Sequence, residues 1–154
     1  MEGYRIADEP KAGGLAQLVV NPVFPLLAIM FGGVWLAFPW GVLNGFAMGS
    51  ANRWRELAVV LVGWVVQVGI VFGALVLGGM GLLPEIALPY VFIGRTVIGI
   101  AVAYQLYVLQ APSFALHRYY GGTVRNGLPV IVIGFLVRPR LLEAAPLLLT
   151  LVLM

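Results

Sequence analysis

Long apolar runs, separated by short polar stretches, dominate the pattern of this chain. Three of them, residues 22–48, 57–83 and 90–109, each reach the roughly 20 residues that a helix needs to cross a bilayer. The stretches between the runs, "GSANRWRE" and "PEIALP", are polar or rich in proline, as is typical of membrane interfaces and tight connections. The pattern therefore predicts three transmembrane helices, the first of them kinked at Pro39.

The last apolar segment, residues 128–154, is interrupted by Arg138 and Arg140 on either side of a proline. Each of the two pieces is too short to cross a bilayer alone. Three arrangements are open: a fourth span broken near the midplane, a short dip followed by an interfacial helix, and a re-entrant hairpin. We expect the broken span, with its arginines facing protein or water, because a lipid-exposed arginine at that depth costs about 2.5–3.5 kcal/mol. Glu143, one helical turn after Arg140, offsets part of the charge.

Composition agrees with this interpretation. Hydrophobic residues make up 62% of the chain, charged residues 10%, and the mean hydropathy is +1.02, whereas soluble domains carry about 25% charged residues. We expect an all-α, multi-pass integral membrane protein of a bacterial-type cytoplasmic (inner) membrane. Residues 1–20 form a short polar arm in this prediction, and residues 21–154 form a single transmembrane helical domain.

Lysine and arginine counts give a preferred orientation. With three spans, the first and third connections share one side of the membrane, and they contain Arg53, Arg55, Arg118 and Arg125. The rule that cytoplasmic loops are rich in positive charge makes this the cytoplasmic side, which leaves the N-terminus outside.

Small residues recur at every fourth position along the first run. Such seams let helix backbones approach closely, which matters in lipid because no hydrophobic drive holds helices together there. The partner is either another span of this chain or a helix of another subunit, and we assign the seam to partner binding. Its members are Gly33, Ala37, Gly41, Gly45 and Gly49.

Polar residues within or near the spans are candidates for ligand or lipid contact. Arg95 and Gln110 fall on one face of the third predicted helix, where they act either as interhelical hydrogen bonders or as part of an ion or ligand path. Arg95 can also reach the interface or pair with Glu85. His117 and Arg118, in "HRYYGG", belong either to an interfacial loop or to a phosphate headgroup site.

Residues for catalysis are scarce. The chain has one histidine and no cysteine, so it lacks the converging donors that metal and haem sites use. No serine stands near a paired base in the sequence. We therefore expect no enzyme activity, no cofactor and no metal.

These features together suggest a non-catalytic accessory or assembly subunit of a larger membrane complex. Its partners would be other integral membrane subunits, in a hetero-complex rather than a homo-oligomer, and membrane lipids, without nucleic acid. Arg138 and Arg140 would dock on acidic residues or lipid phosphates. The alternative is a self-associating transporter or channel for an anionic solute or lipid, with Arg95 and the same two arginines along its path. A lipid-modifying enzyme built on His117 is a third possibility.

Overall fold

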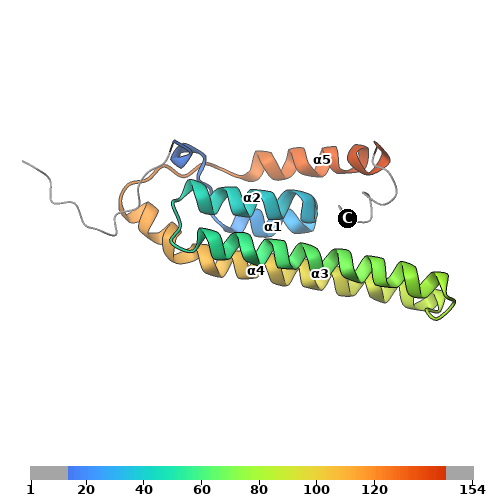
Figure 1. Ribbon diagram of the computed structural model, residues 1–154. Coiled ribbons are helices and arrows are strands. Elements are labelled where there is room, and N and C mark those ends of the chain that lie inside the picture. Colours follow the sequence, from blue (N-terminus) through green and yellow to red (C-terminus); the bar gives the residue numbers. More distant parts are fainter. Residues whose placement is uncertain (1–13, 145–154) are drawn as a thin grey trace, which may run out of the picture.

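The computed structural model describes residues 14–144, which fold into five α-helices and two short 3-10 helices, Ala16–Leu18 and Glu85–Ala87. The all-helical fold class is confirmed. Two helices, α3 (Arg53–Gly79) and α4 (Leu88–Tyr119), are long and apolar enough to cross a membrane. At 1.5 Å per residue they measure about 40 and 48 Å, and they form a long antiparallel hairpin (Figure 1).

The first apolar run is not a single span, which corrects the prediction for residues 22–48. It forms two short helices, α1 (Val23–Phe31) and α2 (Val34–Ala47), of about 14 and 21 Å. They lie side by side and antiparallel (Figure 1), so that Val20, just before α1, hydrogen-bonds to Asn44 near the end of α2. The chain thus turns back before it has covered the length of α3.

The turn between α1 and α2 is made by glycine. Gly33 has φ 90° and ψ −173°, a region that side chains exclude almost completely. The N–H groups of Gly32 and Gly33 both donate to the carbonyl of Ala28, which closes the end of α1. Pro39, where the sequence predicted the kink, lies inside α2 without ending it.

The other predicted spans match helices with shifted bounds. Residues 57–83 correspond to α3, and residues 90–109 to α4, which continues through Pro112 to Tyr119 before Gly121 (φ 75°) ends it. The last helix, α5 (Leu128–Ala144), runs without interruption through Arg138–Arg140, so the predicted break is not found there. Residues 145–154, the rest of that predicted span, lie outside the described residues.

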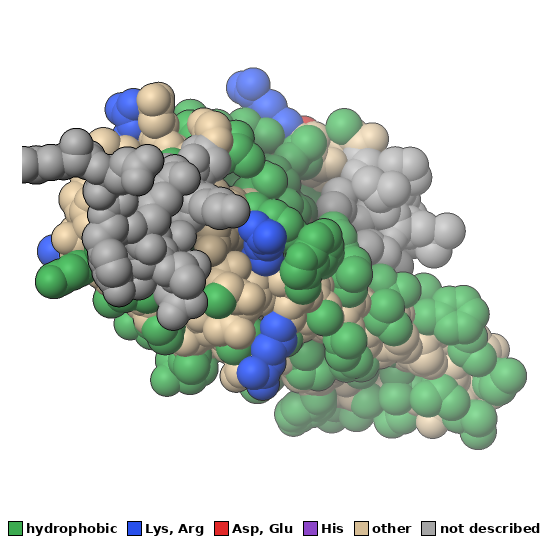
Figure 2. Space-filling model, turned by 60° about the vertical axis from the view of Figure 1, so that its left-hand side comes forward, with side chains coloured by type: hydrophobic (Ala, Val, Ile, Leu, Met, Phe, Trp, Pro, Cys, Tyr) green, Lys and Arg blue, Asp and Glu red, His purple; other side chains and the backbone are tan. Residues whose placement is uncertain are grey.

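The core lies where α1, α2, α3, α4 and α5 meet. Phe38 of α2 is fully buried there, and its ring contacts the edge of Trp64 on α3 at 6.4 Å between centroids. The far half of the α3–α4 hairpin is uncovered: between Phe72 and Gly94, no described side chain is buried. That half projects beyond the other helices, and its surface is largely apolar (Figures 1 and 2).

Candidate functional site

Buried polar side chains form two separate groups, one of which is complete within the chain. Glu56, fully buried, accepts hydrogen bonds from Ser50 (Oγ–Oε1 2.5 Å) and from Gln110 (Nε2–Oε2 2.9 Å). Gln110 also donates to the carbonyl of Gly41 at 2.6 Å, and its Oε1 accepts from Asn44 at 3.2 Å. Because these groups satisfy one another, the network ties α2, α3 and α4 together, and Gln110 does not point toward a ligand cavity.

The small-residue seam is also used within the chain. Gly41 and Gly45 are buried, and a Cβ on either would meet Leu106 or Glu56. Ala37 is 1% exposed. Gly33 and Gly49 have positive φ and end or begin helices. Gly41 and Gly45 are therefore covered by the chain's own α3 and α4, whereas binding of a partner along the seam stays a prediction.

The second polar group centres on Arg95 and Gln67, which face each other across the α3–α4 hairpin. Arg95 is 4% exposed and Gln67 1% exposed. The Nε of Arg95 donates to Oε1 of Gln67 at 3.3 Å. Gly99 leaves room for the amide, since a Cβ there would lie 3.4 Å from Gln67 Nε2. That Nε2 is buried and has no hydrogen-bond partner within residues 14–144, which is costly unless an acceptor reaches it.

A cavity of about 490 Å³ opens beside this pair. Arg138 of α5 also lines it, so two guanidinium groups and the amide of Gln67 share the same space. Among the described residues of its lining, none is acidic. The remainder of the lining comes from α1, α2 and α4 and is apolar or small, apart from Thr96: Ile29, Met30, Gly33, Val34, Phe92, Gly99 and Ile100.

The beginning of α2 also faces this cavity. Gly33 and Val34, the first residues of the helix, are among the lining residues. The first N–H groups of a helix lack intrahelical partners, and the helix dipole adds partial positive charge there. The hairpin turn therefore presents a positive helix end to the space that Arg95 and Arg138 share, an arrangement found where half-helices bind anions inside membranes.

The cavity lies about halfway along α3. Gln67 is close to the middle of the 27-residue α3, and the α1–α2 turn reaches the same level. A hydrocarbon core of about 30 Å centred on α3 would place this group of donors near its midplane.

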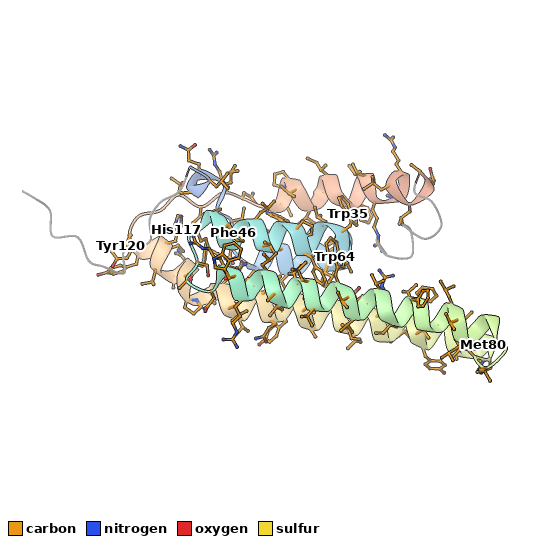
Figure 3. All side chains as sticks on the ribbon, viewed as in Figure 1. Trp35, Phe46, Trp64, Met80, His117 and Tyr120 are labelled. Atoms are coloured by element: carbon orange, nitrogen blue, oxygen red, sulfur yellow. The ribbon has the colours of Figure 1, made fainter. Side chains whose placement is uncertain are left out.

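The remaining predicted contact residues lie elsewhere. Arg140 is exposed and is not among the residues that line the cavity. His117 sits at the end of α4 beside Tyr120, away from the cavity (Figure 3), and its Nε2 lies 3.1 Å from the carbonyl of Thr123. Arg118 is exposed near His117. The structure thus joins Arg95 with Arg138, separates both from His117 and Arg118, and adds Gln67, which the sequence shows only as an isolated polar residue in an apolar run.

Metal chemistry finds no support in the described part of the chain: residues 14–144 contain no group of three or more His, Asp or Glu side chains that could hold an ion. Comparison with protein families, with curated proteins and with solved structures finds no match.

Proposed function

We propose that this protein is a multi-pass membrane protein that binds an anionic solute or lipid headgroup within the bilayer and moves it across. One observation carries the proposal: Arg138 and the buried amide of Gln67, which has no hydrogen-bond partner within residues 14–144, line one cavity beside Arg95, and no described residue of the lining is acidic. Charged side chains at such depth are costly unless they pair or serve a ligand or ion path. An anion offers acceptors to the guanidinium of Arg138 and to the amide of Gln67 at once.

In this proposal α3 and α4 cross the membrane, while α1 and α2 enter it to the level of the cavity and return. A chain with so few helices encloses little space, so copies of it would associate to complete a pathway. Arginine suits a carboxylate or phosphate because its planar fork donates two parallel hydrogen bonds.

The test compares two arginines on one helix. Purified protein in mild detergent is titrated with inorganic phosphate and with a short-chain phosphatidylglycerol, and uptake of each anion into proteoliposomes is followed. Arg138→Gln should weaken binding roughly 10- to 150-fold, as expected for loss of a hydrogen bond to a charged group worth about 1.5–3 kcal/mol. Arg140→Gln, with the same chemistry outside the cavity, should bind like the parent protein. Equal losses in both variants, or no binding of either anion by the parent, would overturn the proposal.

A second candidate is the non-catalytic accessory subunit of a larger complex, favoured by the projecting half of the α3–α4 hairpin. Gly69 and Gly73 stand one helical turn apart there, and a Cβ at either position would meet nothing within 4 Å. A partner helix could approach closely at that surface. Gentle solubilisation followed by mass measurement separates the two: distinct co-purifying chains favour the subunit, and a homo-oligomer favours the transporter.

A further inference from the structure

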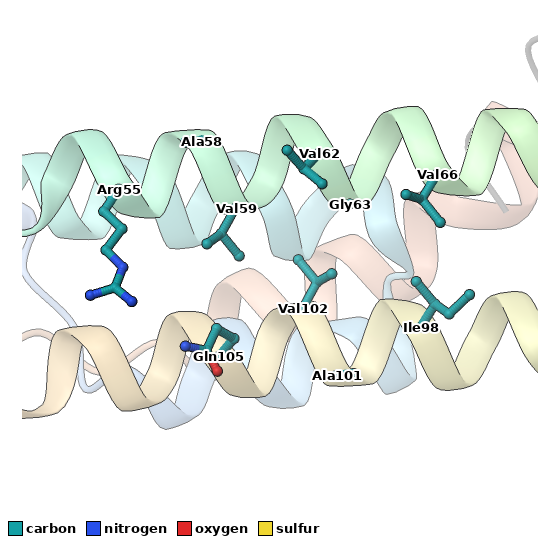
Figure 4. Close-up of a pocket in the computed structure, with 10 residues that line it drawn as sticks. All are labelled: Arg55, Ala58, Val59, Val62, Gly63, Val66, Ile98, Ala101, Val102 and Gln105. Atoms are coloured by element: carbon teal, nitrogen blue, oxygen red, sulfur yellow. The ribbon is translucent and has the colours of Figure 1, made fainter.

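A shallow groove of about 470 Å³ runs along the outer surface where α3 and α4 cross (Figure 4). It is hollow because small residues form its floor: Ala58 and Gly63 on α3, and Ala101 on α4. The helices touch beneath it at Gly63, where a Cβ would come within 2.7 Å of a methyl group of Val102. Branched side chains form its walls: Val59, Val62, Val66, Ile98 and Val102.

The groove has the length of one bilayer leaflet. From Arg55 to Val66 the helix rises about 16 Å at 1.5 Å per residue, close to half of a hydrocarbon core of about 30 Å. Its apolar part begins one turn inside α3 and ends near the level of Gln67. An acyl chain lying in it would therefore extend from the interface to the midplane.

One end of the groove is polar. Arg55 and Gln105 extend into it from the two helices (Figure 4). Within residues 14–144 Arg55 makes no hydrogen bond or ion pair, and the neighbouring Glu56 is buried with Ser50 and Gln110 as its partners. Trp54 beside it is 66% exposed and contacts Phe46 edge-on at 5.4 Å, a position suited to the membrane interface.

We propose that this groove binds a phospholipid with a net negative headgroup, of the phosphatidylglycerol type. One acyl chain lies against Ala58, Gly63 and Ala101, and the phosphate accepts hydrogen bonds from Arg55 and Gln105. Charge complementarity selects this occupant: the polar end of the groove offers a guanidinium and an amide but no carboxylate. This site is separate from the cavity at Arg138, on a different face of the α3–α4 hairpin, and does not depend on the proposed transport.

The experiment measures which lipid the protein keeps. Full-length protein is reconstituted in nanodiscs of equal phosphatidylglycerol and phosphatidylcholine, released in mild detergent, and weighed with its bound lipid by native mass spectrometry. The parent should retain phosphatidylglycerol over phosphatidylcholine by about fivefold, the ratio that about 1 kcal/mol per interfacial arginine produces. Arg55→Gln should abolish this preference. Ala101→Leu, which fills an exposed hollow rather than the core, should lower retention of both lipids.

Two controls keep the outcomes distinct. Arg53→Gln removes an exposed arginine that lies over the Phe46 ring at 5.9 Å and does not line the groove, so the preference should persist. Arg138→Gln should leave lipid retention unchanged, even if it abolishes anion binding in the cavity. An unchanged preference in Arg55→Gln, or an equal loss in Arg53→Gln, would overturn the proposal. The proposal would also be overturned if a protein chain, rather than lipid, co-purified with the parent protein and was released by Arg55→Gln.

Discussion

A single methyl group added at Gly45 should disturb the buried hydrogen-bond network around Glu56 directly. Gly45 lies on α2 opposite the carboxyl of Glu56 and the amide of Gln110, with no space left between them. A Cβ at residue 45 would overlap Glu56 Oε2, and it would lie 2.9 Å from Glu56 Cδ and 3.1 Å from Gln110 Nε2. Neither side chain can swing into solvent, since Glu56 is 0% and Gln110 1% exposed.

The cost of Gly45→Ala follows from the bonds that must break. Moving the carboxyl away breaks its 2.9 Å hydrogen bond with Gln110 and leaves a buried polar group unpaired, at a cost of about 1–3 kcal/mol. Alanine regains about 0.5–1 kcal/mol of this cost, because glycine in a helix loses more conformational freedom on folding than alanine does. The free energy of unfolding should therefore fall by up to about 2.5 kcal/mol relative to the parent protein.

The assay is reversible unfolding in mixed detergent micelles, followed by tryptophan fluorescence. Gly69→Ala is the matched control, because it also lies inside a helix but its Cβ would meet nothing within 4 Å; it should be neutral or stabilising by up to about 1 kcal/mol. Adding Gln110→Ala to Gly45→Ala should cost less than the sum of the two single changes. If Gly45→Ala is as stable as Gly69→Ala, the tight network around Glu56 is not as described.

Three further changes test other parts of the fold. Gly33→Ala should lower the free energy of unfolding by about 1–3 kcal/mol because of its φ of 90°, and should weaken anion binding as the start of α2 moves; unchanged stability would argue against the hairpin turn. Asn44→Ala removes the partner of both the N–H and the carbonyl of Val20, so we expect a loss of about 1–3 kcal/mol and faster amide exchange at Val20; slow exchange there would contradict it. Gly134→Leu should overfill the contact with Leu36 and destabilise the packing of α5 by about 1–3 kcal/mol, seen as a lower melting temperature, whereas an unchanged melting temperature would show that α5 lies farther from α2.

The two longest helices could be predicted from the sequence because their apolar runs are uninterrupted. The polar end of α4 could not be predicted, since Pro112 and the residues after it are typical of a connection. In the structure the helix continues through them, and Phe114 packs against a cluster of Val19, Ala47 and Met48. The first run carried two competing signals, a glycine pair and Pro39. Proline in a helix interior suggested a kink, but only the glycine pair allows the backbone to reverse.

The charged residues of the candidate site could be predicted from the sequence, but the way the fold brings them together could not. Arg95 and Arg138 stand out as arginines in apolar surroundings, whereas Gln67 gains its role only because the α3–α4 hairpin sets it opposite Arg95. The small-residue seam indicated a surface for close helix contact, and its assignment to partner binding stays a prediction, because a periodic pattern alone does not say whose helix fills it. Here Leu106 and Glu56 of the same chain do so.

In the proposed membrane arrangement, the α1–α2 hairpin changes the number of crossings, and with it the side of the membrane on which residue 14 lies. Because the α1–α2 hairpin returns to the side on which it begins, residue 14 lies on the same side as Arg53, Arg118 and Arg125. The bridge between Val20 and Arg125 joins two segments of the chain at that end. In this arrangement the charge rule makes the arginine-rich end cytoplasmic, so we expect residue 14 on the cytoplasmic side, opposite to the side predicted from three full spans. Reporter fusions placed after residues 14 and 122 should then give the same signal, and the opposite signal at residue 82.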